Sequence, residues 1–194
     1  VKKDDKVVLS WIQGDGIDAG GASYKIGNKV VNAGPVTTFQ HYAVVSENRL
    51  SLQPKELDDI TAVLLGCAAP TGMGGVFNIL KLNNTSKIII FGAGGIGLCA
   101  CLACKNSRPK EVIFIEPNKA RRDLAKKFGA TKTIDPKSKN FLELFNSQLI
   151  EKFDFAIEAS GQLNCVEIST KTIKNQGGKT LIIGNAPFGS SIKV

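Results

Sequence analysis

Several features that would assign this protein to a class are missing from its sequence. The 194 residues contain no apolar run near the roughly 18 residues that a membrane-spanning helix needs. Residues 1–6 are charged and include no apolar signal core and no initiator methionine. We therefore expect no membrane partner, and we expect a mature fragment or an engineered piece whose residue 1 is not the natural start.

A stripe of basic residues is also missing, although the net charge is +8, from 25 basic and 17 acidic side chains. The lysines and arginines are scattered along the chain and are not interleaved with aromatic residues, as a nucleic-acid surface would require. We interpret them as solvated faces and predict no nucleic-acid partner.

The five cysteines are poorly placed for a disulfide framework, because Cys99, Cys101 and Cys104 crowd into one short segment. This placement favours a reducing, cytoplasmic setting. The spacing Cys101-x-x-Cys104 invites a metal or redox interpretation. We favour a packing role instead, because a helix on a sheet needs small side chains there. The single histidine, His41, is expected on the surface of a strand.

The first 53 residues have the texture of a β-rich domain. Short strand-like segments occur at 6–11, 29–34 and 37–46, with a glycine-rich stretch after the first of them. From Pro54 the spacing becomes helical, and it predicts two helices over 54–82 that meet near Cys67–Gly74, with an interruption around Pro70–Gly75. The early segments are too short to form a core alone, so they resemble part of a larger domain.

After residue 86 the sequence alternates between buried strands and helices. Strands are predicted at 87–92, 111–116, 131–135, 153–160 and 178–184, and helices at 96–106, 118–129, 140–150 and 165–173. Alternation of this kind produces a parallel sheet with helices on both faces. The predicted fold class is α/β, a Rossmann-type doubly wound sheet of order 3-2-1-4-5, preceded by the partial β-rich segment.

Glycines 92, 94 and 97 form a G-x-G-x-x-G motif whose surroundings fit a dinucleotide site. The apolar strand ending at Phe91 precedes it, a helix of small residues follows, and Glu116 ends the next strand 19 positions after Gly97. A glycine turn with a following acid also occurs in S-adenosylmethionine sites, but three glycines at this spacing favour a dinucleotide.

Each glycine has a physical role in such a motif. Gly92 allows the tight turn, Gly94 lets the pyrophosphate approach the backbone, and Gly97 lets the helix pack close to the sheet. The helix N-terminus offers free N–H groups and partial positive charge to the phosphates.

The acid after the second strand bears on the choice of coenzyme. Glu116 can accept hydrogen bonds from the ribose hydroxyls, and its charge disfavours the 2′-phosphate of NADP, so we predict NAD. Arg121 and Arg122 lie a turn beyond and weaken that preference slightly, although we interpret them mainly as the solvated face of their helix.

These segments together resemble the medium-chain, zinc-type alcohol dehydrogenase family. The likeness covers nearly the whole chain, and its segments occur in the family's order. They read VKKDDKVVLSW, FQHYAVVSENRL, GCAAPTGMGGVFN, IIIFGAGGIG, EVIFIEPNKARRDLAKKFGATKTID, FDFAIEASG and LIIGNAP. The resemblance implies that residues 1–53 are a remnant of a GroES-like catalytic domain and that 54–194 are an NAD-binding Rossmann domain without its last strand.

The resemblance also implies roles for individual residues. Cys67 matches the third protein ligand of the catalytic zinc, and Thr71 matches a residue near the nicotinamide. The remaining matches are cofactor-binding positions: Gly92, Gly94, Gly95, Ile96, Gly97, Glu116, Arg121, Ser160, Gly161, Ile183, Gly184 and Asn185.

The departures from the family pattern limit these expectations. The family's first zinc ligand, a Cys, and its second, a His beside a Glu, have no match here, so Cys67 is expected as a free thiol in this chain. Residues 12–34 contain no cysteine, so the family's four-cysteine structural zinc is not expected. We expect the chain by itself to lack dehydrogenase activity.

For the intact protein the resemblance implies a zinc-dependent, NAD-linked alcohol or polyol dehydrogenase that transfers hydride between substrate and NAD. Its partners would be a small-molecule alcohol or polyol and further copies of itself. Two alternatives stay open: a zinc-free quinone or enoyl reductase of the same superfamily, and a non-catalytic NAD-binding module.

Overall fold

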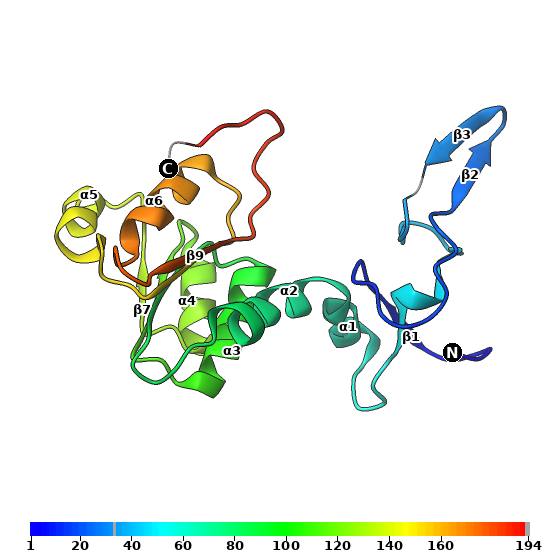
Figure 1. Ribbon diagram of the computed structural model, residues 1–194, viewed down its shortest axis with the longest axis horizontal. Coiled ribbons are helices and arrows are strands. Elements are labelled where there is room, and N and C mark those ends of the chain that lie inside the picture. Colours follow the sequence, from blue (N-terminus) through cyan, green and yellow to red (C-terminus); the bar gives the residue numbers. More distant parts are fainter. Residues whose placement is uncertain (33, 193–194) are drawn as a thin grey trace. The chain divides into compact units, whose positions relative to one another are not determined.

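The computed structural model describes residues 1–32 and 34–192 and divides into two compact units, Val1–Ala68 and Ala69–Val194. Figure 1 shows the ribbon of each unit coloured along the sequence. The sequence predicts a domain boundary after residue 53, whereas the boundary between the compact units falls after Ala68. The interpretation of the two parts as a catalytic remnant and a coenzyme domain is a separate matter and stays a prediction.

The first unit contains two small antiparallel sheets. β1 (Val7–Leu9) pairs with β4 (Leu50–Leu52), and β2 (Ser23–Ile26) pairs with β3 (Lys29–Asn32) in a hairpin whose turn holds Gly27 at φ 59°. Residue 33, at the end of the predicted strand 29–34, lies outside the described residues. The predicted strand over 37–46 is wrong, because the structure forms no strand there.

The later boundary follows from how the first helices pack. The short 3-10 helix η1 (Glu47–Arg49) leads into β4, and α1 (Asp59–Ala62) continues into the 3-10 helix η2 (Val63–Gly66). Gly66 lies so close to β1 that a Cβ on it would stand 2.4 Å from the carbonyl oxygen of Leu9. Since η2 is pressed against β1, residues 54–68 belong to the first unit.

The helical stretch breaks at Cys67 (φ −150°, ψ −66°), within the predicted meeting region Cys67–Gly74, whereas the interruption predicted around Pro70–Gly75 is wrong because helix runs through it. α2 (Ala68–Gly74) continues directly into the π-helical η3 (Gly75–Leu80). Pro70 is tolerated because it lies in the first turn of α2, where a backbone N–H has no partner within the helix.

No single helix among residues 1–32 and 34–192 is long and apolar enough to cross a membrane. One bent pair, Asp59–Gly66 with Ala68–Leu80, passes that test by length and composition only.

The second unit is built on a five-stranded parallel sheet of order β7-β6-β5-β8-β9. Counted from β5, this is the predicted order 3-2-1-4-5, and the prediction is confirmed. The strands are β5 (Lys87–Phe91), β6 (Glu111–Ile115), β7 (Lys132–Ile134), β8 (Phe155–Glu158) and β9 (Lys179–Ile182). The connecting helices are α3 (Gly95–Ser107), α4 (Lys119–Phe128), α5 (Phe141–Leu144) with η4 (Phe145–Leu149), and α6 (Leu163–Thr172).

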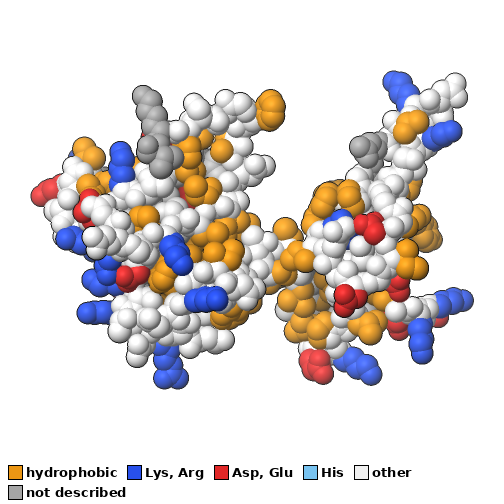
Figure 2. All heavy atoms as spheres, in the orientation of Figure 1, with side chains coloured by type: hydrophobic (Ala, Val, Ile, Leu, Met, Phe, Trp, Pro, Cys, Tyr) orange, Lys and Arg blue, Asp and Glu red, His pale blue; other side chains and the backbone are white. Residues whose placement is uncertain are grey.

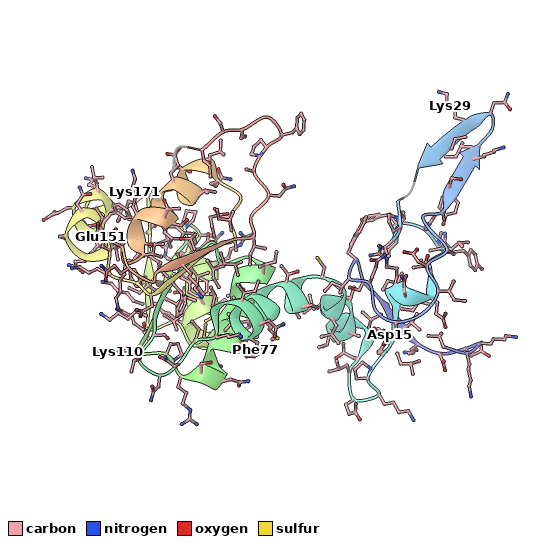
Figure 3. The ribbon with its side chains drawn as sticks, viewed as in Figure 1. Asp15, Lys29, Phe77, Lys110, Glu151 and Lys171 are labelled. Atoms are coloured by element: carbon pink, nitrogen blue, oxygen red, sulfur yellow. The ribbon has the colours of Figure 1, made fainter. Side chains whose placement is uncertain are left out.

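Alternate residues of β5 belong to two separate cores, one on each face of the sheet. Ile88 and Ile90 pack with residues of η3, α3 and α4, whereas Ile89 and Phe91 pack with residues of η4 and α6. Strands buried on both faces read as continuous apolar runs, as IIIF does. Figure 3 shows side chains filling both faces, with the exposed charged residues Lys110, Glu151 and Lys171 outside them. On the face shown in Figure 2, lysines and arginines are spread over this unit among uncharged side chains.

Candidate coenzyme site

The glycine motif lies at the carboxyl end of β5, where parallel sheets bind ligands. Gly92 has φ +92°, a conformation that favours glycine, and its N–H donates to the carbonyl of Ile115 at 2.9 Å. A Cβ on Gly97 would stand 2.1 Å from the carbonyl oxygen of Gly92, so α3 can start this close to the sheet only with glycine there.

The N-terminus of α3 is open, in contrast to these two crowded glycines. Gly94 is the N-cap residue, no side chain caps it, and a Cβ added to it would meet nothing within 4 Å. Gly95 is exposed and Ile96 half-buried, and the N–H groups of this first turn have no partner within the helix. This geometry fits a pyrophosphate, because a bare helix N-terminus offers both donors and positive potential to an anion.

Glu116 joins the glycine loop to the next strand. Its side chain is buried, with one carboxylate oxygen accepting from the N–H of Ala93 and the other from the N–H of Asn118, both at 2.8 Å. A carboxylate has room for about four hydrogen bonds, so acceptor capacity for ribose hydroxyls is left. The sequence suggested the ribose role for Glu116 but gave no sign of its bonds to the two loops.

The two arginines that follow Glu116 differ in their environment. Arg121 is exposed on α4, as predicted. Arg122 was also predicted on the solvated face of this helix, and that prediction is wrong because its side chain is largely buried. One terminal nitrogen of Arg122 donates to the carbonyls of Glu116 and Pro117, both at 2.8 Å, and the other pairs with Asp135 at 3.1 Å. Periodicity could not separate these neighbours, because the partners of Arg122 come from the ends of two strands.

A second buried acid organises the ends of β8 and β9. Glu158 is completely buried, and its carboxylate accepts the N–H of Ser160 at 2.7 Å, the N–H of Gly161 at 3.1 Å and the Ser160 hydroxyl. Its backbone carbonyl accepts the N–H groups of Ile183 and Gly184 at 2.8 and 2.9 Å. Four residues predicted to contact the coenzyme (Ser160, Gly161, Ile183 and Gly184) are thus held together by one residue. The fifth, Asn185, is exposed beside Gly161.

Glu158 was not predicted from the sequence as an organising residue. A usable signal was present, however. An acid that ends an apolar strand two residues before Ser-Gly can accept the N–H groups of the turn that follows.

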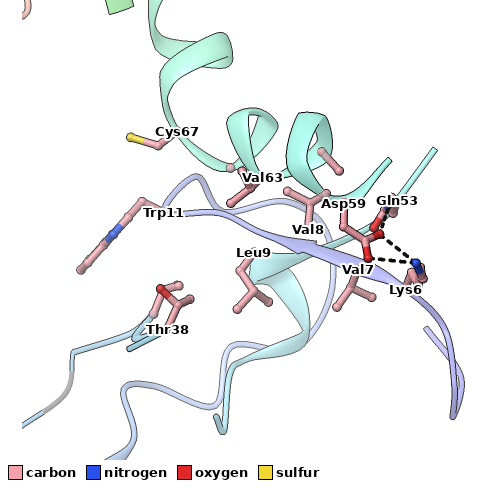
Figure 4. Close-up of a pocket in the computed structure, with 13 residues that line it drawn as sticks. Lys6, Val7, Val8, Leu9, Trp11, Thr38, Gln53, Asp59, Val63 and Cys67 are labelled. Atoms are coloured by element: carbon pink, nitrogen blue, oxygen red, sulfur yellow. Dashed lines mark hydrogen bonds and ion pairs between the residues drawn. The ribbon is translucent and has the colours of Figure 1, made fainter. Parts of the chain in front are cut away.

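Cys67 is the residue at which the helical stretch breaks, and Thr71 lies four residues later in α2. Cys67 is exposed and borders a pocket of about 630 Å³ in the first unit, together with Trp11 and Thr38 (Figure 4). Lys6 and Asp59 form an ion pair at 2.8 Å in the lining of this pocket. Thr71 is half-buried in α2, next to Gly72, where a Cβ would stand 2.3 Å from the carbonyl oxygen of Ile96. Thr71 is therefore adjacent in sequence to a direct contact with the first turn of α3.

The residues present do not make a zinc centre. Among residues 1–32 and 34–192, no three His, Cys, Asp or Glu side chains come together in a group that could hold a metal ion. A catalytic zinc needs three protein ligands, and Cys67 supplies one at most. Its role as a ligand stays a prediction.

The helix cysteines are packed as expected, whereas His41 is exposed as expected but does not lie on a strand. Cys101 and Cys104 are buried in the core between α3 and the sheet, and burial raises the pKa of their thiols to about 11 and about 12. Cys165 is half-buried, with a pKa raised by burial, and His41 is exposed. The packing interpretation of Cys101-x-x-Cys104 is confirmed.

Comparison with known proteins decides the family. The model of the zinc-binding dehydrogenase family matches residues 95–194, which is more than half of the chain. The chain belongs to the zinc-binding dehydrogenase family. The dehydrogenase interpretation from sequence is confirmed at this level, which leaves the substrate and the coenzyme of this member unassigned.

Individual members of the family are similar over long stretches. The S-(hydroxymethyl)glutathione dehydrogenase of Photobacterium damsela subsp. piscicida is 29% identical over 192 residues, 96% of this chain and 52% of its own. The crystal structure of benzyl alcohol dehydrogenase from Acinetobacter calcoaceticus is 28% identical with a TM-score of 0.69, covering 77% of this chain and 41% of that one.

A third comparison supports the fold alone. A zinc-binding dehydrogenase from Sinorhizobium meliloti 1021, solved with NADP, is 24% identical with a TM-score of 0.72 over 86% of this chain and 49% of its own. The chain therefore spans about half the length of the curated relatives it matches.

Proposed function

We propose that this chain supplies the coenzyme-binding part of an NAD-linked alcohol or polyol dehydrogenase. The observation that carries the proposal is the open N-terminus of α3 at Gly94, at the carboxyl end of β5, with the buried carboxylate of Glu116 bonded to the same loop. NAD, when bound, would supply the acceptor for a hydride from the substrate carbon. The protein's task is to hold the coenzyme in place and exclude water.

The residues of the second unit divide this task. The first turn of α3 binds the pyrophosphate, and Glu116 orients the adenosine ribose. Ser160, Gly161, Ile183 and Gly184, fixed by Glu158, line the nicotinamide half. Because Glu116 is negative and already accepts two N–H donors, it disfavours a 2′-phosphate, and we propose NAD over NADP.

Calorimetric titration of this chain with NAD and with NADP tests the proposal. We expect saturable binding of NAD and weaker binding of NADP. Gly94→Val should abolish NAD binding and keep the thermal unfolding midpoint close to that of the wild type, because the space around a Gly94 side chain is free. Absence of NAD binding by the folded wild-type chain, or tighter binding of NADP, would contradict it.

We also propose that Cys67 is one zinc ligand in a full-length protein that contains this sequence. Its exposed thiol beside a pocket is compatible with that role, and the other ligands must come from outside the described residues. The test is metal content and turnover of such a protein and of its Cys67→Ser variant. No zinc in the wild type, with unchanged turnover in the variant, would favour the zinc-free reductase.

A further inference from the structure

We propose that Asp135 is a specificity-determining positioning residue, which favours NAD by neutralising Arg122 and holding it away from a 2′-phosphate. The proposal rests on the proposed function, since it concerns the ribose end of the same coenzyme site. It adds Asp135, which directly follows β7, to the choice between NAD and NADP that is otherwise assigned to Glu116.

Arg122 connects its own helix, α4, to the ends of two strands, β6 and β7. From α4 its guanidinium reaches the carbonyls of Glu116 and Pro117, at the end of β6, and the carboxylate of Asp135, directly after β7. Its side chain is only 16% exposed, against 33% for Asp135. The other carboxylate oxygen of Asp135 accepts the N–H of Lys137 at 2.9 Å, which fixes the acid as well.

This position places a guanidinium next to the residue that would bind the ribose. Because Arg122 bonds to the backbone of Glu116, its guanidinium lies directly beside the residue proposed to hold the ribose, whereas no such bond is found for Arg121 among the described residues. Arginine beside this position is a recognised way to accommodate that phosphate. Arg122 is therefore a potential ligand for the 2′-phosphate of NADP that is already bonded to two backbone carbonyls and to Asp135.

Asp135 changes the charge that a phosphate would meet. Glu116, Arg122 and Asp135 together carry a net charge of about −1 at neutral pH, because two acids surround one base. An incoming 2′-phosphate would be repelled by this group and would have to compete with Asp135 for the guanidinium. Without the carboxylate of Asp135, the net charge becomes about zero and Arg122 is available.

The decisive variant is Asp135→Asn, which keeps the shape of the side chain and removes its charge. Titration of the chain should show that the ratio of NADP affinity to NAD affinity rises about fivefold, mainly because NADP binds more tightly. This is the size of effect expected from one partly exposed charge contact. Adding Arg122→Gln to this variant should remove the gain. The shift should also shrink in about 1 M salt, which screens charges beyond a few ångströms.

Glu111→Gln is the matched control, because Glu111 is an acid of nearly equal exposure that pairs with Lys87 at 3.9 Å and lies at the opposite end of β6 from Glu116. It should leave the ratio unchanged. A second arm, Arg122→Gln alone, should weaken NADP further and leave NAD within about twofold, since only the phosphate meets the added net negative charge.

The outcomes separate the two proposals. Binding of neither coenzyme by the wild type would overturn the proposed function. Binding of NAD with equal weakening of both coenzymes in Asp135→Asn would show a purely structural role and overturn this inference alone. An equal ratio shift in Glu111→Gln would reduce the effect to general surface charge and would also overturn it.

Discussion

The carboxylate of Glu158 occupies the space that a side chain on Gly184 would need: a Cβ on Gly184 would stand 2.2 Å from its Oε2 and 2.3 Å from the backbone nitrogen of Gly161. The Glu158 carboxylate therefore packs directly against the backbone of Gly184, with no room for a second side chain between the ends of β8 and β9. Glu158 can bind the turn after β8 with its carboxylate and the end of β9 with its carbonyl because residue 184, which faces the carboxylate, is glycine.

Gly184→Ala should destabilise the second unit by about 2 kcal/mol or more, because neither the buried acid nor the backbone of Gly161 can move away cheaply. Urea unfolding followed by circular dichroism measures the effect. Gly94→Ala is the control, since a methyl group there enters free space. Equal stability of the Gly184→Ala variant and the wild type would show that this end of the sheet is loosely packed.

Gly94→Ala should have the opposite profile, with normal stability and impaired coenzyme binding. Replacing glycine by alanine at an N-cap costs no more than about 1 kcal/mol. The added methyl stands where the pyrophosphate would approach, and we expect about tenfold weaker NAD binding, which corresponds to about 1.4 kcal/mol. Calorimetry of the folded variant measures this, and unchanged affinity would show that the phosphates bind elsewhere.

The glycine motif was predictable because its evidence is local. Gly92 has the strained φ and Gly97 the close packing, while Gly94 faces free space, so each role inferred from G-x-G-x-x-G has a structural counterpart. The strand order also followed from the alternation of strands and helices, since right-handed crossovers leave few arrangements.

The parts that sequence could not supply depend on contacts between distant elements. Nothing local marks Arg122 for burial and Arg121 for exposure, because Asp135 is brought to one of them by β7. Residues 37–46 include the β-branched and aromatic residues typical of a strand, yet Phe39 and Tyr42 are exposed and no strand in the described part of the chain pairs with them. β propensity alone does not form a strand without a partner.

Thiol labelling should distinguish Cys67 from the helix cysteines. At about pH 8 only about one in a thousand molecules carries a thiolate at a group with a pKa of about 11, and burial also blocks the reagent. We expect Cys67 to react fastest in the native chain, with that reaction absent from Cys67→Ser, slower reaction of the half-buried Cys99 and Cys165, and reaction of Cys101 and Cys104 only on unfolding. Mass spectrometry of alkylated peptides identifies the sites, and fast labelling at position 101 or 104 would contradict this packing.

Acid should weaken the second unit through Asp154. Desolvation acts to raise the pKa of this carboxyl, but hydrogen bonds from Lys174 at 2.6 Å and the N–H of Lys87 at 2.8 Å prevail and lower it below 3.8. A lowered folded-state pKa means that the stabilisation is fully present above the unfolded value and is lost as pH falls through the folded one.

Asp154→Asn should therefore cost about 1–2 kcal/mol near pH 6, after allowance for the half-exposed lysine, and much less near pH 2. Unfolding in urea at both pH values measures the difference. Lys174→Met should give a smaller loss, because the bond from Lys87 remains. A penalty for Asp154→Asn that is the same at both pH values would show that ionisation of this acid does not matter.

The central place of β5 also constrains the order in which the second unit can fold. Ile89 pairs with Ile113 of β6 and with Ala156 of β8, which lies much farther along the chain. Closing the shorter loop loses less entropy, so β5, α3 and β6 should form first and offer an edge on which β8 and β9 assemble. The loop that carries the glycine motif would then be shaped early, before the far half of the sheet exists.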